Sequence, residues 1–327
     1  MIRTTGMALI GALLLHCGVS AAVEPLWLSD TPPSSQWAKR TRHAHGGPVE
    51  RGRRGVFVKR LWLKAGSDPA TAAYTGWPDD AEIRITGPHA GAVTPKEFTA
   101  EEGGGFTFSM PDEGFYDAYL TRRHVDGDVL VAHVIKAEVL KHSCANGHDR
   151  RTTVALMSPR VSQGAPLEIV RERLHNEDFH THIVSGDRLR LRVYRDGKPA
   201  GGATVRLTTQ KGWSKRVVAD AEGRATFQLV GDYFPKWTDF DEDRRERFLA
   251  EASYTISEPG SFQGQPYRTE RYVTTLAGSY YPARSAYSSY LYGLLVVLFA
   301  AALALAGVFF YRLKRVKVVR ERFDEKA

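Results

Sequence analysis

The chain has 327 residues, of which 43% are hydrophobic and 25% are charged. This is an ordinary globular composition, and it excludes a disordered or fibrous protein. The formal net charge is +8, but the last sixteen residues hold seven Lys or Arg against three Asp or Glu, so the charge does not predict a nucleic-acid-binding surface on the rest of the chain.

The first 22 residues have the pattern of a secretory signal peptide. A basic start precedes the apolar run Met7–Leu15, and the small residues Ser20 and Ala22 follow with one residue between them, as before a signal-peptidase cleavage site. Cleavage would remove Cys17 and leave Cys144 as the only thiol of the mature chain, which excludes an internal disulfide. An uncleaved signal would give two membrane spans and the same exposed body.

Residues 23–160 are predicted to form an N-terminal β-rich domain. Alternating apolar and polar residues predict strands at Glu82–Thr86, Phe106–Met110, Phe115–Arg122 and Val129–Leu140. The last two strands are joined across Asp126-Gly127, a dipeptide typical of hairpin turns. This hairpin would place His124 and His133 on one face of the sheet but not opposite each other, and we expect both to be structural.

The loop after the strand ending at Leu140 holds two imidazoles and one thiol within seven residues, at His142, Cys144 and His148. The turn dipeptide Asn146-Gly147 allows these side chains to point toward one centre. Histidine together with cysteine is a suitable donor set for copper, zinc or nickel. We therefore predict a metal site here, with a polar turn and an inert thiol as the alternative.

Residues 161–278 are predicted to form an Ig-like β-sandwich, after a boundary rich in Pro and Gly near residues 158–166. Apolar side chains alternate with polar ones at Leu189, Leu191 and Val193, and Asp196-Gly197 follows as a turn. Further short strands separated by turns continue to Leu276. Strands of this length and spacing favour a β-sandwich.

Two further histidines, His180 and His182, lie just before the turn at Ser185-Gly186-Asp187. In an extended segment these two imidazoles would share one face, because side chains alternate with a period of two. Neighbouring side chains would then complete a shell of nitrogen and oxygen ligands, at His175, Glu177 and Asp178. An exposed strand end without a ligand is the alternative interpretation.

An acidic run from Asp239 to Asp243 is followed directly by basic residues, at Arg244, Arg245 and Arg247. We interpret this segment as a solvated loop in which the two signs of charge neutralise each other. No Gly-x-Ser-x-Gly, His-Glu-x-x-His or paired-cysteine motif occurs in the sequence. We therefore expect the chain not to be an enzyme.

Four motifs of the second half occur in a recognisable order, at Ala165–Val170, Ser185–Arg190, Asp196–Val205 and Asp220–Phe227. They resemble the periplasmic accessory domain family found with nickel and cobalt uptake transporters, and the last two are also similar to the carboxypeptidase-regulatory type of Ig-like module. The resemblance implies an exported, membrane-held domain that binds a divalent transition metal or presents it to a transporter. Members of the family commonly begin the mature chain with a histidine, whereas Val23 would begin this one.

The segment Leu291–Tyr311 is uncharged, strongly apolar and of about the 20 residues that a bilayer-spanning helix requires. A tyrosine-rich stem, residues 279–290, precedes it, and a basic tail, residues 312–327, follows it. Aromatic residues at one edge and Lys or Arg at the other place the tail in the cytoplasm. We therefore expect a single-pass protein of the inner membrane with its body in the periplasm; a buried core helix is the alternative.

Taken together, the sequence predicts an all-β protein with two Ig-like β-sandwich domains before one C-terminal transmembrane helix. Its expected role is that of an accessory protein of metal uptake, with nickel or cobalt favoured by the resemblance and copper kept open by Cys144. The expected partners are membrane transporter subunits and the membrane itself, and not nucleic acid. The alternatives are a non-catalytic Ig-like structural or interaction subunit of a membrane complex and a copper-binding periplasmic protein.

Overall fold

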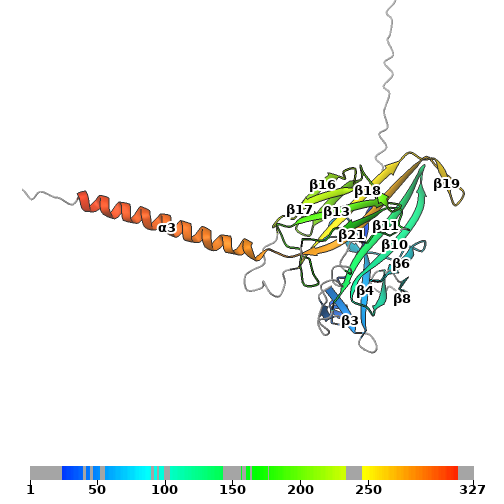
Figure 1. Cartoon of the computed structure of the whole chain (residues 1–327), viewed down its shortest axis with the longest axis horizontal. Helices are drawn as coiled ribbons and strands as arrows, with labels where there is room; N and C mark the ends of the chain where they lie inside the picture. The colour runs from blue at the N-terminus through cyan, green and yellow to red at the C-terminus, as the bar shows by residue number, and fades with distance from the viewer. Residues whose placement is uncertain are drawn as a thin grey trace, which may run out of the picture.

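The computed structural model describes residues 24–39, 42–44, 47–51, 56–89, 92–93, 96–98, 104–142, 156, 160–162, 164–175, 177–232 and 245–315. Within these ranges the chain is mostly β, with several sheets and one long apolar helix, α3 (Figure 1). The predicted signal peptide and most of the predicted basic tail lie outside the described residues.

The first half of the chain contributes strands β1 to β11. Their bounds are β1 (Leu26–Ser29), β2 (Arg42–Ala44), β3 (Gly47–Arg51), β4 (Phe57–Ala65), β5 (Ala73–Tyr74), β6 (Glu82–Thr86), β7 (Ala92–Val93), β8 (Lys96–Phe98), β9 (Gly105–Met110), β10 (Gly114–Asp126) and β11 (Val129–Lys141). The second half contributes β12 (Glu168–Arg171), β13 (Arg188–Arg195), β14 (Lys198–Pro199), β15 (Thr204–Thr209), β16 (Ser214–Val218), β17 (Arg224–Gln228), β18 (Glu246–Ile256), β19 (Gly260–Phe262), β20 (Gln265–Tyr267) and β21 (Thr269–Tyr280). Helix α1 covers Ser35–Ala38, and helix α3 covers Arg284–Arg315.

A central sheet of eight strands runs through the body in the order β16-β15-β18-β21-β11-β10-β6-β7 (Figure 1). Strands β11 and β21 pair in parallel, from Val129 opposite Thr269 to Lys136 opposite Leu276. Strands from both halves of the chain therefore belong to one sheet. The predicted boundary near residues 158–166 falls between β11 and β12, while the hydrogen bonds of β11 and β21 join the halves on either side of it.

A seven-stranded sheet covers one face of the central sheet. It has the order β2-β3-β4-β9-β8, with β1 and β5 also paired to β4. Its buried side chains, such as Leu63 and Phe106, pack with Ile135, Ala137 and Val139 of β11. These three are the odd-numbered positions of β11, which therefore face this first core.

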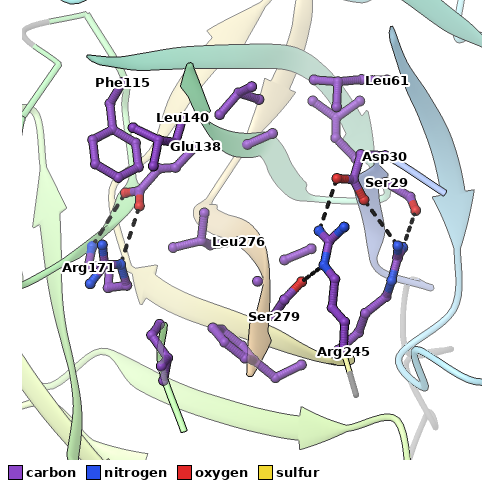
Figure 2. A pocket seen from close by; sticks show the side chains of 18 of the residues that line it. Ser29, Asp30, Leu61, Phe115, Glu138, Leu140, Arg171, Arg245, Leu276 and Ser279 are labelled. Carbon is purple, nitrogen blue, oxygen red and sulfur yellow. Dashed lines mark hydrogen bonds and ion pairs between the residues drawn. The ribbon is translucent and has the colours of Figure 1, made fainter. Parts of the chain in front are cut away.

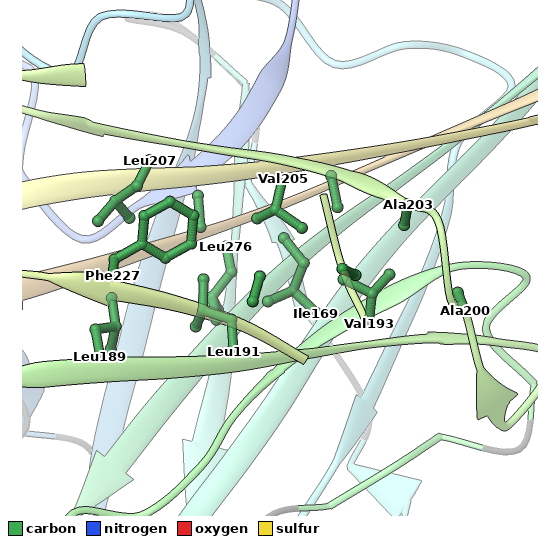
Figure 3. Close-up of a cluster of buried hydrophobic side chains, with 14 of the residues drawn as sticks. Ile169, Leu189, Leu191, Val193, Ala200, Ala203, Val205, Leu207, Phe227 and Leu276 are labelled. Atoms are coloured by element: carbon green, nitrogen blue, oxygen red, sulfur yellow. The ribbon is translucent and has the colours of Figure 1, made fainter. Parts of the chain in front are cut away.

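A four-stranded sheet, β12-β13-β14 with β17 also paired to β13, covers the opposite face. Leu191 of β13 and Phe227 of β17 lie in this second core (Figure 3). They pack there with Phe248 of β18 and Ala132 of β11. Ala132 is an even-numbered position of β11, and side chains of a strand alternate between faces, so the two cores lie on opposite sides of one sheet. The body is thus two sheet-on-sheet packings that share their middle layer; the Ig-like character of either half stays a prediction.

The hairpin predicted across Asp126-Gly127 is confirmed. Strands β10 and β11 pair antiparallel along their whole length, beginning with Asp126 opposite Val129, and Gly127 has φ 60°. His133 pairs with Arg122 and not with His124, as predicted. The two imidazole rings stack diagonally with centroids 5.8 Å apart.

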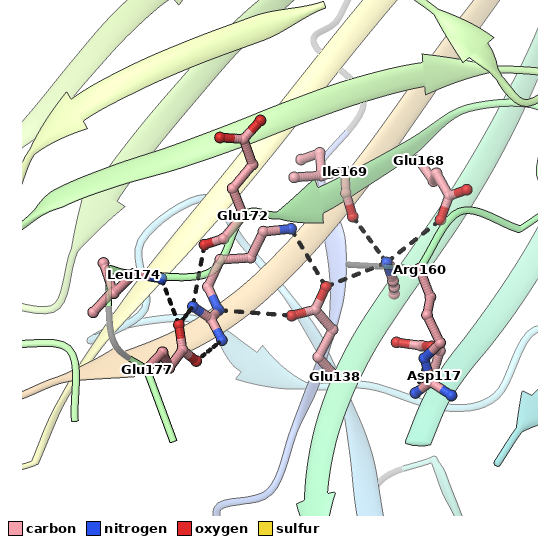
Figure 4. Close-up of polar contacts among 10 residues, drawn as sticks. Asp117, Glu138, Arg160, Glu168, Ile169, Glu172, Leu174 and Glu177 are labelled. Atoms are coloured by element: carbon pink, nitrogen blue, oxygen red, sulfur yellow. Dashed lines mark hydrogen bonds and ion pairs between the residues drawn. The ribbon is translucent and has the colours of Figure 1, made fainter. Parts of the chain in front are cut away.

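A buried ion cluster ties the central sheet to β12. The ammonium of Lys136 is fully buried and lies 3.3 Å from Glu138 Oε1 and 3.4 Å from Glu168 Oε2, and it donates to the carbonyl of Ile169 at 3.1 Å (Figure 4). Burial disfavours the charged ammonium, but Glu138 and then Asp117 outweigh it and raise the pKa of Lys136. The cation therefore stays charged and links side chains of both halves.

The same cluster perturbs a second buried group, Asp117 of β10. Burial raises the pKa of Asp117 to about 6, although Lys136 and Arg160 favour its ionised form. Arg160 Nη2 lies 2.9 Å from Asp117 Oδ2. Nearby, Arg171 donates through Nη1 and Nη2 to the two carboxylate oxygens of Glu177, at 2.8 and 2.5 Å. These pairs fix the segment that follows β12 against the central sheet.

Helix α3 leaves the body from the end of β21 (Figure 1). Its segment Tyr290–Arg315 has 26 residues, none of them buried in the structure, and includes the predicted span Leu291–Tyr311. At 1.5 Å per residue it is about 39 Å long, which exceeds the ~30 Å hydrocarbon core of a bilayer. Among the described residues it is the one helix long and apolar enough to cross a membrane.

Candidate functional site

The end of the body next to α3 is defined by the parallel pairing of β11 with β21. Strands β11 and β21 run in the same direction, with Lys136 opposite Leu276. The residues that follow the two strands therefore emerge at the same end of the central sheet. His142 directly follows β11 there, and Tyr281 directly follows β21, three residues before α3 begins. We call this end of the sheet the helix-proximal end of the body.

Two of the predicted metal ligands meet at the helix-proximal end. The ring of His142 is buried and stacks on Phe179, with centroids 4.7 Å apart and planes 2° from parallel. The exposed ring of His180 stands perpendicular to that of His142, with centroids 4.8 Å apart. The two predicted histidine motifs, 38 residues apart in the sequence, thus contribute one imidazole each to a single place.

The local backbone explains why His180 and His182 separate. The segment is not extended, so the condition for a shared face is not met: Asp178 begins a turn, and its Oδ1 accepts from the amide of His180 at 2.9 Å and from Thr181 Oγ1 at 2.8 Å. The hydrogen bond from Thr181 is the main reason that the pKa of Asp178 lies below its ordinary value. His180 consequently turns to His142, whereas His182 packs on Tyr281 with ring centroids 4.5 Å apart.

A carboxylate missed by the sequence analysis lies beside His142. Glu113 Oε2 is 3.4 Å from His142 Nδ1. The last pair of the β10–β11 hairpin is Gly114 opposite Lys141, so Glu113 is one step beyond it and faces His142. The register of the predicted Asp126-Gly127 hairpin, followed to the open end of the hairpin, would have placed Glu113 opposite His142.

The remaining predicted ligands are not part of this pair. Cys144 and His148 lie outside the described residues, so their prediction stands as it was made. Among the residues that the structure describes, no group of three or more His, Cys, Asp or Glu side chains has an arrangement that would hold a metal ion. The described residues therefore form a two-imidazole arrangement with one adjacent carboxylate.

A cavity of about 190 Å³ opens beside His182, between the central sheet and the seven-stranded sheet (Figure 2). His182 and Tyr281 line one side of it. The cavity is also lined by a cluster of charged groups that we call the Asp30 cluster; its members are Asp30, Lys59, Arg245 and Arg247. The cavity therefore combines one imidazole, that of His182, with the cations of the Asp30 cluster, and neither His142 nor His180 is among its lining residues.

Three cations of the Asp30 cluster converge on its single carboxylate. Lys59 Nζ and Arg245 Nη2 donate to Asp30 Oδ2, each at 3.0 Å, and Arg247 Nη2 donates to Oδ1 at 3.1 Å. Arg245 and Arg247 thus pair with a residue more than 200 positions away. The acidic run from Asp239 to Asp243, which they were expected to neutralise, lies outside the described residues. No sequence pattern around Asp30 indicates this, because the pairing depends on the packing of β1 against β18 and β21.

The cations strongly perturb each other and Asp30. Burial disfavours the carboxylate, but Arg245, Lys59 and Arg247 outweigh it and hold the pKa of Asp30 well below its ordinary value. Burial lowers the pKa of Lys59 and of Arg247, and Asp30 only partly offsets this. Asp30 is therefore held in its ionised form by the cations around it.

No family model matches the chain, and no curated protein matches it. Among solved structures, the chain is similar to "Biofilm associated protein - BSP domain", with 13% identity, 66% of this chain and 27% of that chain covered, and a TM-score of 0.16. It is also similar to "Ca2+-stabilized adhesin helps an Antarctic bacterium reach out and bind ice", with 10% identity, 80% of this chain and 49% of that chain covered, and a TM-score of 0.19. The chain thus spans about a quarter and about half of the lengths of these two chains.

Proposed function

We propose that this chain is a non-catalytic, membrane-anchored accessory protein that binds a divalent transition metal outside the cytoplasm and presents it to a membrane transporter. Nickel or cobalt is the proposed cargo, with copper as the alternative. The supporting observation is the convergence of His142 and His180, with ring centroids 4.8 Å apart, at the end of the body from which α3 leaves.

The separation of the two rings suits a shared ion. When two imidazole nitrogens each lie about 2.0–2.1 Å from one tetrahedral ion, the ring centroids are about 5 Å apart. His180 is exposed, so its ring can turn about its side-chain bonds to direct a nitrogen at an ion held by His142. Imidazole is a ligand suited to nickel, copper and zinc.

Glu113 has a defined part in this proposal. A carboxylate near one ring nitrogen favours a proton there and leaves the other nitrogen for the metal. With Glu113 Oε2 3.4 Å from His142 Nδ1, the Nε2 atom of His142 is the proposed ligand. Two protein ligands leave coordination positions for water or for a group of the transporter, which is the arrangement that metal transfer requires.

The proposed membrane orientation is supported by the residues at the two ends of α3. Tyr290 and Tyr292 lie at its body side, and Arg312, Lys314 and Arg315 lie in its last turn. The excess of Lys and Arg marks the cytoplasmic side of a span. We therefore propose that the body, and with it the histidine pair, lies on the periplasmic face of the inner membrane, close to the bilayer surface.

A second candidate function is a scaffold without a ligand. It is favoured by the absence of a three-ligand group among the described residues, together with an exposed apolar helix that provides a membrane anchor. In this case the body would dock on a membrane complex through the stem and α3.

Equilibrium dialysis of the full-length chain in detergent micelles against Ni²⁺, Co²⁺ and Cu²⁺ tests the proposal. We expect micromolar binding in the wild type and at least about tenfold weaker binding in each of His142→Ala and His180→Ala, because each variant removes one ligand. His89→Ala, which changes an exposed histidine elsewhere, is the matched control. A wild-type chain that binds none of these metals would leave only the scaffold function.

Metal uptake by cells separates the two functions further. Under the proposal, the double variant His142→Ala/His180→Ala assembles normally at the membrane but lowers uptake. If uptake is unchanged in that variant and is lost only when Leu291–Tyr311 is replaced by an unrelated span, the protein acts as a scaffold.

A further inference from the structure

Strand β16 is the first strand in the order of the central sheet, so among the described residues one of its two edges has no neighbouring strand (Figure 1). We call this the free edge of β16. Ala219, directly after β16, donates to the carbonyl of Ala203 at 2.8 Å, and in the antiparallel register this pairing recurs at every second residue. The odd-numbered residues of β16 therefore bond to β15, and the backbone N–H and C=O groups of Ser214, Arg216 and Val218 point to the free edge.

The backbone groups at the free edge are open to solvent. Ser214, Arg216 and Val218 are all exposed, and Val218 has an exposed fraction of 63%. In the part of the chain that the structure describes, the outward N–H and C=O groups of these residues have no backbone partner. An edge of this kind is a template for another strand, which would form about two backbone hydrogen bonds at each outward residue.

The side chains of β16 give its two faces the same order of chemistry. Side chains of a strand alternate between faces, so Arg216 and Val218 share one face and Lys215 and Val217 share the other. Val217 packs against the edge of the second core and is only partly buried. Each face of the free edge thus has one cation followed by one apolar side chain that a further strand would cover.

Lys215 and Arg216 make the free edge positively charged. Neither side chain forms an ion pair with another residue that the structure describes, and both are exposed. The nearest carboxylate across the sheet is engaged elsewhere: Arg206, opposite Arg216 on β15, pairs with Glu251 at 2.8 Å. Solvent screens Lys215 and Arg216 in the free chain, and their attraction to an anion strengthens when a partner excludes water.

We propose that the free edge of β16 docks an extended acidic segment of a partner protein, which adds to the central sheet as a further strand. Opposite residues of neighbouring strands share a face, so acidic side chains of the segment lie opposite Lys215 and Arg216, and apolar ones lie opposite Val217 and Val218. In either strand direction the segment has two adjacent acidic residues next to two apolar ones. Backbone hydrogen bonds supply affinity, and the side chains select the partner.

A second copy of this chain is a poor occupant of the same edge. Antiparallel pairing of two β16 strands about a two-fold axis at Arg216 would put the two guanidinium groups opposite each other. Like charges directly opposite in a sheet are destabilising. The cations that protect the free edge against self-association therefore favour an acidic strand over a second copy.

The free edge begins at the helix-proximal end of the body. Ser214, the first residue of β16, is opposite Thr208 of β15, and Thr208 is opposite Leu249 of β18. Leu249 is in turn opposite Ala277, near the end of β21 that leads to α3. A segment of a membrane partner beside α3 therefore has access to β16. The inference does not depend on the metal site, since no histidine belongs to the free edge.

Fluorescence anisotropy of labelled peptides, titrated with the full-length chain in non-ionic detergent, tests the proposal. The peptides have the cores Ile-Val-Glu-Glu and Glu-Glu-Val-Ile, one for each strand direction. We expect saturable binding of one of them, at least about tenfold weaker in Lys215→Glu/Arg216→Glu, because two attractive pairs become repulsive. The variant should instead bind the same peptide with Lys-Lys in place of Glu-Glu. Arg190→Glu, which changes an exposed arginine of β13, is the control and leaves binding unchanged.

N-methylated peptides test the backbone hydrogen bonds with the wild-type chain alone. Alternate residues of a strand face one neighbour, so methylation of one alternate set of peptide amides should abolish binding, and methylation of the other set should leave it intact. Equal effects of the two sets would show that charge alone holds the peptide, and would overturn strand addition. Near-ultraviolet circular dichroism establishes that the charge-reversed variant is folded.

Three further outcomes would also overturn the proposal. The first is that the folded wild type binds neither acidic peptide. The second is that binding appears only after Asp239, Asp241, Glu242 and Asp243 are changed to their amides, which would assign the free edge to the chain's own acidic run. The third is a dimer of the wild type in analytical ultracentrifugation that Arg216→Glu abolishes, which would assign the edge to a second copy.

Discussion

Replacement of Lys136 by methionine tests the buried ion cluster that joins the two halves of the body. The ammonium of Lys136 has no exposure and faces Glu138 at 3.3 Å and Glu168 at 3.4 Å. Its removal leaves Glu168, whose side chain is 1% exposed, without its cation. Removing one partner of a buried pair costs about 3–5 kcal/mol, because the other charge stays buried and uncompensated.

Two hydrogen bonds set the expected loss at the lower part of that range. Glu168 also accepts from Tyr119 Oη at 3.0 Å and from the amide of Ser162 at 2.5 Å, and both remain in the variant. We therefore expect Lys136→Met to lower the free energy of unfolding at pH 7 by about 3 kcal/mol. The double variant Lys136→Met/Glu168→Gln removes the orphaned charge and should recover more than half of this loss.

Urea unfolding of the full-length chain in detergent, followed by tryptophan fluorescence, measures these differences. Lys215→Met, at an exposed position of β16, is the control and is expected to change stability by less than about 0.5 kcal/mol. A loss below about 1 kcal/mol in Lys136→Met, or no recovery in the double variant, would refute the assignment of Lys136 as the cation that holds Glu168.

Three other predictions concern single side chains of the same body. Burial, and then His124, lower the pKa of His133 to about 4, so the contribution of His133 to stability is present above pH 6.5 and is lost as the pH falls toward 4. This contribution amounts to about 3 kcal/mol. Urea unfolding of His133→Gln should therefore show a free energy of unfolding that depends less on pH than that of the wild type. Asp117 acts with the opposite sign, because its pKa is raised to about 6: its stabilising contribution is present below pH 3.8 and is lost as the pH rises through 6. Asp117→Asn should therefore gain up to about 3 kcal/mol relative to the wild type between pH 4 and pH 7, and a constant difference across that range would contradict the shift. Gly278→Ala would bring a methyl group 2.2 Å from the ring of Phe248 and should destabilise by about 1–3 kcal/mol in thermal unfolding, whereas Gly76→Ala, where nothing lies within 4 Å, should be neutral; equal effects would argue against the close packing at the cavity.

The parts of the fold that the sequence could predict are those with local patterns. Leu189, Leu191 and Val193 alternate with polar residues and do form β13, and Asp126-Gly127 does form the hairpin turn. Strand β4 was missed because two of its nine residues, Lys59 and Lys64, are buried lysines that interrupt the alternation. The cation of Lys59 is accommodated by Asp30, a partner that no local pattern reveals.

The pairing of β11 with β21, which joins the two halves of the chain in one sheet, could not be predicted from local sequence patterns either. Strand β11 is buried on both faces for most of its length, and such a strand has no alternation to show which sheet or core it meets. Its parallel partner, β21, is more than a hundred residues later in the chain. Separate domains were therefore the natural expectation from sequence, whereas the structure shows a shared central sheet.

The candidate site was predictable in its residue types but not in its pairing. Spacing along the chain assigns His142 and His180 to separate motifs, and it does not show which motifs meet in the fold. The turn begun by Asp178 moves His180 away from His182 and toward His142. Glu113 follows from the hairpin register, whereas the Asp30 cluster depends on contacts between segments more than 200 residues apart.

Electron spin echo envelope modulation of the full-length chain loaded with one equivalent of Cu²⁺ tests most directly whether the two histidines share a metal. The wild type and the His89→Ala control should show the modulation of two coordinated imidazoles. His142→Ala and His180→Ala should each show one. Two coordinated imidazoles in both of these variants, or no bound copper in the wild type, would contradict the account.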